Sequence, residues 1–494
     1  MMADVCLLLE GSYPYVAGGV SSWTHDLIRA QSDLTFHVVS LMPTRATPPR
    51  KYELPPNVVG HTHIALQELA PGSAPRGFER LVHRIGPSLE ALQDDGHIDH
   101  LGCLLREVAP HRRALGRTVL LDSRAAFALV SSMYGRMMPD ASFINYFWSW
   151  RSLAGGLFAV ALAELPDARV YHSVSTGFAG LLAARAKLET GRPVILTEHG
   201  IYTNERRIEI TMADWLGDRA DESFSLDRAR SGLRELWIRT FESYSRICYE
   251  ACDQIITLYS GNQVLQRRDG APEHALRVVP NGVDLSRFAS VVAPDGARPR
   301  RIGFVGRVVP IKDVKTFIRA CALVMRRCTD VEAVVLGPVD EDDGYARECR
   351  ALVASLGMED RLRFLGQVRL EQHLATLDVV VLTSISEAQP LVVLEAGAVA
   401  IPVVATDVGS CRELLEGRPD ETPALGPGGI VTSLASPEQT SAAIVQLLQN
   451  ENLRIAYGRT LQERVRRYYN KAVIDQTYRA IYREQIEQQA TWQA

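Results

Sequence analysis

The sequence lacks the features that identify several common classes of protein. Its eight cysteines include no Cys-x-x-Cys pair, so their spacing predicts neither a zinc ribbon nor a disulfide framework. Most of them lie in apolar or helical runs, where a thiol packs as a small hydrophobic group. There is also no surplus of positive charge, because 54 basic residues are set against 58 acidic ones and the net charge is −4. That balance argues against a protein that grips nucleic acid through bulk charge.

Long hydrophobic runs are missing as well. The longest nearly uncharged run, residues 391–405, contains Glu395 and Pro402 and is shorter than the roughly 20 residues of a membrane span. Residues 1–10 have no basic segment and too short an apolar run for a signal peptide. We therefore expect a reduced, soluble, cytoplasmic protein that reaches the inner face of a membrane only through partners.

Three catalytic motifs are absent too. No Gly-x-Gly-x-x-Gly follows a strand, and there is neither a Gly-x4-Gly-Lys-Ser/Thr loop nor a Gly-x-Ser-x-Gly turn. These absences argue against a nicotinamide or flavin enzyme, a P-loop enzyme and an α/β-hydrolase. No Asp-x-Asp pair stands out as a metal ligand, so we expect no metal and no cofactor.

What the sequence does contain is an alternation of strand-like apolar runs and helical patterns, which is typical of α/β proteins with parallel sheets. Its 494 residues leave room for two to four domains, with two Rossmann-like domains the economical reading. The expected strands are residues 4–9, 36–42, 168–174, 194–197 and 254–258 in the first half, and 276–279, 301–305, 332–336, 362–365, 379–383, 402–405 and 429–431 in the second.

The domain boundaries follow from polar and proline-rich stretches. We expect an N-terminal domain over residues 1–268, with a large insertion of helices and loops at about 43–166. A polar connector near 267–273 precedes a C-terminal domain over 274–465. The tail from residue 453 onward has the pattern of two helices, and we expect residues 466–494 to pack back on the N-terminal domain.

Two cations follow the strand expected at 301–305. Gly306-Arg307 comes directly after it, and Lys312 stands five residues later at the head of a helix. Ligands of open α/β sheets bind at the carboxyl ends of the strands. A guanidinium fork and an ammonium suit a diphosphate, although a solvated basic turn is the alternative.

A second candidate segment follows the strand expected at 379–383. Glu387 and Glu395 stand eight positions apart, and Pro390 is expected at the first position of a helix. The free N–H groups of Leu391 and Val392 would then lie at the positive end of the helix dipole, where a pyrophosphate binds well. Taken alone, Glu395 reads as an ordinary solvated helix residue, but its apolar neighbours indicate a carboxylate that needs a partner.

Several short motifs follow one another along the chain in an order that resembles family-4 retaining glycosyltransferases of the GT-B fold. The resemblance covers the C-terminal half and extends to a glycine loop and a histidine in the N-terminal half. Within the family, the insertion and two short segments are most similar to the glycosyltransferases of Pel-type exopolysaccharide synthesis. The residues that carry the resemblance are Gly18-Gly19-Val20, Glu198-His199-Gly200, Pro280-Asn281-Gly282-Val283-Asp284, Gly306-Arg307, Lys312, Glu387, Glu395, residues 405–410 and Glu413, with residues 10–15 and 384–390 for the Pel type.

The resemblance implies a fold and a set of roles. The fold is α/β, GT-B, with two Rossmann-like domains facing a central cleft. Catalytic roles fall to His199 above the sugar, Glu387 on the sugar hydroxyls, and Arg307 and Lys312 on the leaving diphosphate. Binding roles fall to Gly18, Gly19, Gln389, Leu391, Val392 and, on the ribose, Glu395. Asn281 and Asp407 are expected to be structural.

The expected reaction moves a hexose-type sugar with retention from a nucleotide sugar to a growing exopolysaccharide. By resemblance it is a front-face substitution, without metal, in which the leaving phosphate accepts the acceptor's proton. UDP is favoured by the resemblance alone, since the residues fit GDP and ADP equally well. Partners would be the nucleotide-sugar donor, a polysaccharide acceptor and a membrane export complex, with no nucleic acid.

One departure affects the grip on the sugar. The family usually has a Gly-Phe-Gly type of run after the first carboxylate, whereas this chain has Ala388-Gln389-Pro390. Pro390 removes one N–H, and the Gln389 side chain can supply a substitute donor. Two other functions stay open: a non-catalytic nucleotide-sugar-binding subunit of a synthase complex, and a nucleotide-sugar 2-epimerase of the same fold.

Three further signals are weighed against ordinary structural roles. His172 ends an expected strand and reads as a hydrogen-bonded structural histidine rather than a cleft residue. Arg206-Arg207 could touch phosphate or acceptor, and a solvated pair is equally compatible with the sequence. The aromatic run 143–150 reads as core rather than as a platform for a sugar or a partner.

Overall fold

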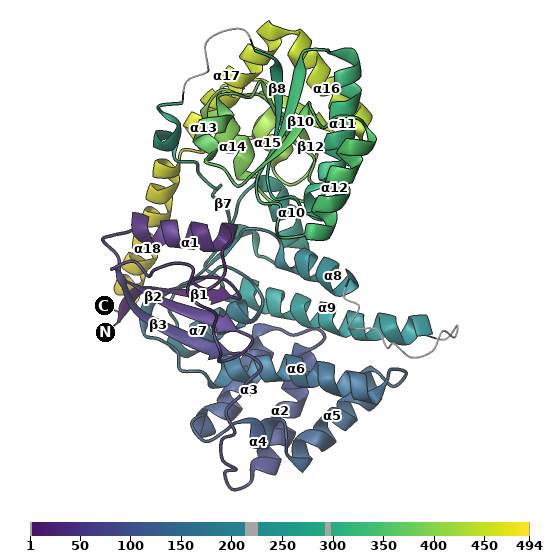
Figure 1. The fold of residues 1–494 in the computed structure, drawn as a ribbon. Coiled ribbons are helices and arrows are strands. Elements are labelled where there is room, and N and C mark those ends of the chain that lie inside the picture. Colours follow the sequence, from purple (N-terminus) through teal and green to yellow (C-terminus); the bar gives the residue numbers. More distant parts are fainter. Residues whose placement is uncertain (1, 213–225, 292–297, 494) are drawn as a thin grey trace. The chain divides into compact units, whose positions relative to one another are not determined.

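Short runs rich in Val, Ile and Leu form two all-parallel sheets, one in each of two units of the chain (Figure 1). The computed structural model describes residues 2–212, 226–291 and 298–493. Unit 1 comprises Met1–Thr257, Asn262–Val278 and Tyr478–Ala494, and unit 2 comprises Leu258–Gly261 and Val279–Thr477.

The sheet of unit 1 has seven strands in the order β3-β2-β1-β4-β5-β6-β7. Every neighbouring pair in this sheet is parallel. Its strands are β1 Ala3–Glu10, β2 Phe36–Met42, β3 Val58–Ala65, β4 Ala168–Ser173, β5 Val194–Glu198, β6 Gln254–Thr257 and β7 Leu276–Val278.

Strand β3 corrects the expectation that residues 43–166 contain only helices and loops. It pairs in parallel with β2 at the edge of the sheet. Its sequence, Val-Val-Gly-His-Thr-His-Ile-Ala, has no continuous apolar run, and most of its residues are only partly buried. An edge strand needs no such run, because it packs less of its surface than a central strand does.

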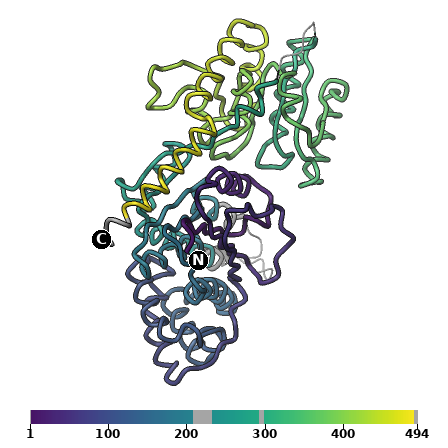
Figure 2. Tube along the Cα trace, turned by 90° about the vertical axis from the view of Figure 1, so that its left-hand side faces the viewer, coloured from purple at the N-terminus to yellow at the C-terminus, as the bar shows by residue number. Residues whose placement is uncertain are grey.

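The helices of unit 1 fall into two groups. Those that alternate with the strands are α1 Gly19–Ala30, α7 Phe178–Thr190, α8 Tyr202–Met212, α9 Leu226–Ala251 and α10 Ser260–Arg268, with η3 at Glu273–Ala275. Those between β3 and β4 are α2 Phe78–Leu92, α3 Ile98–Val108, η1 Ala109–His111, α4 Arg117–Leu120, α5 Arg124–Met137 and α6 Phe143–Leu162. Figure 2 shows this second group, coloured blue, gathered into one helical layer.

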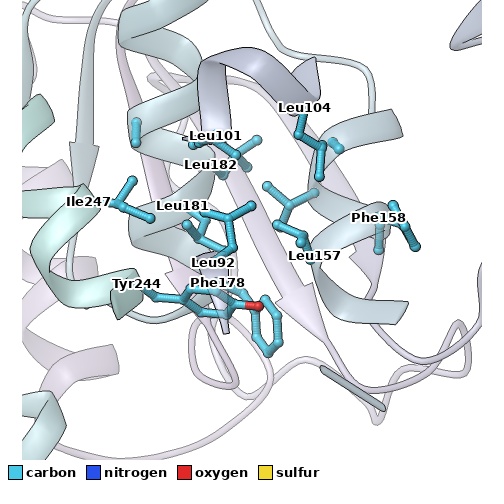
Figure 3. Close-up of a cluster of buried hydrophobic side chains, with 14 of the residues drawn as sticks. Leu92, Leu101, Leu104, Leu157, Phe158, Phe178, Leu181, Leu182, Tyr244 and Ile247 are labelled. Atoms are coloured by element: carbon cyan, nitrogen blue, oxygen red, sulfur yellow. The ribbon is translucent and has the colours of Figure 1, made fainter. Parts of the chain in front are cut away.

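The core of unit 1 joins these helices to each other and to the sheet. Figure 3 shows ten labelled side chains from α2, α3, α6, α7 and α9 pointing toward one another. Leu157, Phe158, Leu181 and Leu182 among them are fully buried. At about 25 cal/mol per Å² of buried apolar surface, such a cluster is a main source of stability for the helical layer.

The sheet of unit 2 has six strands in the order β10-β9-β8-β11-β12-β13. These strands are β8 Arg300–Val305, β9 Val331–Leu336, β10 Leu362–Gly366, β11 Val379–Leu382, β12 Val403–Thr406 and β13 Gly429–Thr432. The helical segments are η4 Leu285–Phe288, η5 Pro310–Lys312, α11 Val314–Arg327, α12 Asp343–Ser355, α13 Leu370–Leu374, α14 Leu391–Ala398, α15 Cys411–Glu416, α16 Pro437–Gln449, α17 Glu451–Tyr468 and α18 Lys471–Gln493. Two separate apolar cores belong to this unit.

The expected start of the C-terminal domain at residue 274 is wrong, as the strand expected at 276–279 shows. As β7 it pairs with β6 in the first sheet, so it belongs to unit 1 and not to a domain that starts at 274. A three-residue strand carries no sequence signal of which sheet it joins. Unit 2 also extends past 465, to Thr477, and the residues of α18 from Tyr478 onward belong to unit 1.

All eight cysteines are free, and six of them are buried, as the apolar runs around them predict. In the part of the chain that the structure describes, no helix is both long enough and apolar enough to span a bilayer.

Candidate functional site

Each sheet has one point where the strand order reverses. In unit 2 the first strand, β8, lies between β9 and the fourth strand, β11, and in unit 1 β1 lies in the same way between β2 and β4. Open α/β sheets of this order bind ligands outside the carboxyl ends of the two strands at the reversal. The expected site residues of unit 2 follow β8 and β11, and those of unit 1 follow β1 and β5.

The loops after β8 and β11 are joined by hydrogen bonds. The Thr383 hydroxyl donates to the carbonyl oxygens of Lys312 (3.1 Å) and Asp313 (2.9 Å). The backbone N–H of Ile385 donates to the carbonyl oxygen of Ile311 at 2.9 Å. These bonds fix the two loops against each other, so both candidate segments of this unit meet at the same edge of the sheet.

Lys312 and Glu387 form an ion pair across these loops. The Ser384 hydroxyl donates a second hydrogen bond, of 2.6 Å, to the Glu387 carboxylate. The side chains of Lys312 and Glu387 are only 22% and 13% exposed, so water screens their charges incompletely. The site therefore presents one fixed cation and one fixed carboxylate side by side.

Gly409 allows a third loop to approach the Glu387 loop closely. Its φ is +52°, and a Cβ there would lie 2.2 Å from the Glu387 carbonyl oxygen. The N–H of Ser410 donates to the carbonyl oxygen of Ala388 at 2.8 Å. A larger residue would strain the backbone and push this support away from Glu387.

Arg307 is placed at the end of β8, where its Nη1 donates to Glu341 at 2.8 Å. Both side chains of this pair are about half exposed. Surface ion pairs of this kind contribute about 0–1 kcal/mol, so the guanidinium can exchange Glu341 for another anion at little cost. Arg307 thus has a different partner from Lys312, which pairs with Glu387.

Gln389 connects the Glu387 loop to the segment that opens unit 2. Its Oε1 accepts a hydrogen bond of 2.6 Å from the N–H of Asn281. Its Nε2 is buried and has no hydrogen-bond partner within the described residues, and the same holds for Oδ1 of Asn281. A buried amide with an unused donor is uncommon in folded proteins, and it marks a place where a ligand could bind.

Helix α14 begins at Leu391, and Pro390 stands just before it. Pro390 is its N-cap rather than its first helical residue, and the first bond of the turn joins the N–H of Val393 to the Pro390 carbonyl at 3.1 Å. The correction leaves Leu391 and Val392 in the first turn, where N–H groups have no partner within the helix. They remain candidates for binding an anion.

Glu395 lies one turn into α14 with its side chain 18% exposed. Burial raises the pKa of its carboxyl, and Arg287, whose Nη1 is 4.0 Å away, only partly offsets that rise. Arg287 itself donates to Glu371. The Glu395 oxygens are therefore poorly compensated and suited to accept hydrogen bonds from hydroxyl groups.

In unit 1, Gly18 and Gly19 begin helix α1. Gly18 is the N-cap with extended backbone angles that any residue can adopt, and a Cβ at either glycine would meet no protein atom within 4 Å. Both residues are exposed. Packing within the chain therefore gives no reason for glycine here.

His199 follows β5 and contacts the side of α1. Its ring lies edge-on to that of Trp23, with 4.5 Å between the centroids. Burial lowers the pKa of His199 to about 4, so the ring is neutral at pH 7. Its Nε2 is shielded from water and has no hydrogen-bond partner among the described residues.

The residue before it, Glu198, is fully buried and hydrogen-bonded. Its Oε2 accepts bonds of 2.8 Å from the Tyr249 hydroxyl and from Nε2 of Gln266. Burial raises the pKa of this carboxyl to about 7, because two neutral donors do not replace the lost hydration of a carboxylate. Glu198 thus anchors the loop that carries His199.

The three weaker candidates from the sequence are His172, Arg206-Arg207 and the aromatic run 143–150. His172 is a hydrogen-bonded structural histidine, as expected, with Nδ1 bonded to Tyr482 at 2.7 Å and Nε2 to Thr197 at 2.9 Å. Arg206 lies over the Tyr202 ring, 3.6 Å from Glu10, and Arg207 pairs with Glu242. The aromatic run 143–150 is only partly core: Tyr146 and Trp150 are buried, whereas Ile144 and Trp148 are 66% and 61% exposed.

The structure brings Lys312, Glu387 and Gln389 into one connected set of loops. In unit 1, His199 contacts Trp23 of the helix that Gly18 and Gly19 begin. Sequence reasoning gave Ser384 no role of its own within the segment 384–390, and it missed Trp23. Ser384 could have been found as a hydroxyl three residues before the carboxylate, and Trp23 as an aromatic residue one turn after the glycine pair. Among the residues described, no cluster of three or more His, Cys, Asp or Glu side chains could hold a metal.

Solved structures share this fold. Sucrose-phosphate synthase from Thermosynechococcus elongatus aligns over 97% of this chain and 98% of its own, with a TM-score of 0.57 and 18% identity. Anabaena HepE in complex with UDP aligns over 97% and 100%, with a TM-score of 0.60 and 15% identity. The chain has the α/β GT-B fold with two parallel Rossmann-like sheets, as the sequence predicts.

Family models divide the chain into two matches. Residues 3–274 match the family described as "Domain of unknown function (DUF3492)", and the chain belongs to that family. Residues 299–450 match "Glycosyl transferases group 1".

A curated relative matches half of the chain. D-inositol 3-phosphate glycosyltransferase of Kineococcus radiotolerans is 32% identical over 267 residues, which are 49% of this chain and 59% of the relative. The chain thus spans less than two thirds of the length of this relative.

Proposed function

We propose that this protein is a retaining glycosyltransferase that transfers a hexose-type sugar from a UDP-sugar to a growing exopolysaccharide of the Pel type. The observation that carries the proposal is the pairing of Lys312 with Glu387 at the strand-order reversal of unit 2. The group 1 family match over 299–450, the inositol-phosphate glycosyltransferase relative and the UDP complex of HepE support it. The Pel assignment rests on the sequence resemblance described above.

The diphosphate would be received by cations and by the start of a helix. Lys312 exchanges Glu387 for a phosphate oxygen, Arg307 leaves its exposed partner Glu341, and the N–H groups of Leu391 and Val392 complete the set. Breaking the bond from the anomeric carbon to phosphate leaves negative charge on the UDP. Fixed positive groups stabilise that charge in the transition state. These groups supply the stabilisation that a divalent metal supplies in other transferases, so we propose that no metal is needed.

The carboxylates and amide would hold the donor's hydroxyl groups. Glu387, released by Lys312, accepts hydrogen bonds from the sugar, and Glu395 accepts them from the ribose. The unused Nε2 of Gln389 can donate to the donor, in place of the N–H that Pro390 lacks.

Unit 1 would bind the acceptor. Gly18 and Gly19 leave open space at the start of α1, and the neutral His199 offers its unpartnered Nε2 to the sugar. In the transfer, the acceptor oxygen bonds to the anomeric carbon as the bond to phosphate breaks. The acceptor's proton passes to the departing phosphate oxygen, so no carboxylate nucleophile is required.

The proposal is tested by the release of UDP. The purified full chain is incubated with UDP-glucose, UDP-GlcNAc or UDP-GalNAc, with and without a chelator, in the presence of oligosaccharide acceptors. We expect release of UDP from one of the donors at a rate that the chelator does not change. A donor that raises the Tm while no UDP is released under any acceptor would instead indicate a binding subunit, and interconversion of free UDP-sugars would indicate an epimerase.

A further inference from the structure

Unit 2 contains a cavity of about 180 Å³ at the edge of the sheet opposite to the proposed donor site. Asp378 and Pro402, which line it, directly precede β11 and β12, so the cavity lies at the amino ends of the strands. The donor-site loops follow the carboxyl ends. Even the four residues of β11 span roughly 13 Å at 3.3 Å per residue, so the two places are distinct.

One wall of the cavity carries more cations than carboxylates. Asp378, which is nearly fully buried, accepts a bond of 2.8 Å from Arg298 and lies 3.4 Å from Arg300 and 3.8 Å from Arg454. Among the residues that the structure describes, one further carboxylate lies nearby, that of the exposed Glu451, 3.2 Å from Arg454. Within the described part of unit 2, three guanidinium groups thus share two carboxylates.

Among these three arginines, Arg454 has a buried N–H group without a hydrogen-bond acceptor in the described residues. Its side chain is only 10% exposed, and its Nη1 is buried and has no hydrogen-bond partner among the described residues. Burial and the nearby Arg300 and Arg298 lower the pKa of Arg454, which reflects the crowding of like charges around it. Arg454 also lies in the first turn of the 18-residue helix α17, where the helix dipole adds positive potential. Each of these features favours a bound anion.

The rest of the cavity is apolar. Leu377, Val399, Ile401 and Pro402 line it together with Ala375 and Ile455. A dry apolar cavity of about 150 Å³ is large enough for benzene. The cavity is therefore large enough for a molecule the size of benzene, and the guanidinium of Arg454 lines one wall.

We propose that this cavity binds a small organic monocarboxylate, whose carboxylate meets Arg454 and whose apolar body lies against Leu377, Val399 and Ile401. The apolar lining favours such a molecule over inorganic phosphate, which has no surface to bury there. The amide analogue of the same shape lacks the charge that the arginines require. This site is separate from the proposed transferase activity and needs no sugar or nucleotide.

The test uses benzoate as the probe, with benzamide and inorganic phosphate as matched comparisons. We expect a saturable rise in the Tm of the full chain with benzoate at millimolar concentration, and dissociation constants at least about tenfold weaker for benzamide and phosphate. R454Q should weaken benzoate binding at least tenfold, because the charge-assisted bond is lost. A375L, which fills the cavity and keeps every charge, should weaken it as well.

R459Q, on the same helix but outside the cavity lining, is the control and should bind benzoate like the unchanged chain. The Tm without ligand and circular dichroism establish that each variant is folded. The proposal is overturned if benzoate gives no saturable shift, if R454Q binds it as tightly as R459Q does, or if benzamide or phosphate binds as well as benzoate. Because no donor sugar is involved, these outcomes are independent of the release of UDP.

Discussion

Lys312 and Glu387 neutralise each other's charge in unit 2. The ion pair lies between the loops that follow β8 and β11, and Ser384 holds the same carboxylate from the other side. A diphosphate that attracts Lys312 would free Glu387 for the sugar in the same step. The two halves of the donor would therefore be recognised by the two partners of one pair.

The first prediction concerns the cation of this pair. K312A should lower the rate of UDP release by about 10²–10³-fold, because one preorganised charge on the leaving group is removed. The rate is measured with saturating donor, and circular dichroism checks the fold. K315A is the control, since Lys315 lies three residues on and pairs with Glu348 rather than with Glu387. Equal rates for both variants would remove Lys312 from the mechanism.

The second prediction concerns open space at Gly18. G18A should change the free energy of unfolding by less than about 0.5 kcal/mol, since the new methyl group meets no protein atom. It should nevertheless lower kcat/KM about tenfold or more if a ligand occupies that space, because overpacking costs about 1–3 kcal/mol. G135A on α5, whose Cβ is equally unobstructed, should lower neither quantity. A G18A enzyme with unchanged kcat/KM would show that nothing binds against this glycine.

The third prediction concerns His199. H199A should lower kcat about 10²-fold or more, as expected for the loss of one positioned polar group at the reacting centre. Because the pKa of His199 is about 4, its protonation should not reduce the rate between pH 8 and pH 5.5. H274A, at an exposed position, is the control. A fall in the rate of the unchanged enzyme with a midpoint near 6.5, lost in H199A, would contradict the assignment of a neutral ring.

The fourth prediction is a pH dependence of stability caused by Glu198. Its pKa is about 7 in the folded chain and 4.5 in the unfolded one, so the unfolded chain loses this proton first as the pH rises. The carboxyl therefore costs nothing below pH 4.5 and destabilises the fold progressively up to pH 7, by roughly 3 kcal/mol in all.

E198Q removes the titration while keeping an acceptor for Tyr249 and Gln266. Relative to the unchanged chain, the variant should gain stability as the pH rises from 4.5 to 7, measured by urea unfolding at pH 5 and pH 8. A difference between the two proteins that is the same at both pH values would show that Glu198 titrates normally.

Much of the sheet architecture is predictable from the sequence, because central parallel strands are buried on both faces and read as apolar runs. Phe36–Met42 has the expected bounds, and Val379–Leu382 differs by one residue. Strand β3 is not predictable in this way, since an edge strand with Gly60 and two histidines has no such run. The membership of β7 in the first sheet also depends on long-range pairing and not on its three residues.

For the candidate site too, the sequence identifies single residues, whereas only the fold shows which of them lie together. Motif order identifies Lys312 and Glu387, but only the fold shows that they pair with each other, because 75 residues separate them. The exposed Trp148 on α6 is similar: its aromatic neighbours suggest core, and which face of the helix remains open is decided by what packs on α6.

Helix α14 is eight residues long, about 12 Å from end to end. Its first turn belongs to the segment proposed to receive the pyrophosphate, and Val399 and Ala400, just beyond its last turn, border the arginine-lined cavity. One short helix therefore borders both proposed sites. If binding at one of them changes the affinity at the other, the reverse effect has the same factor.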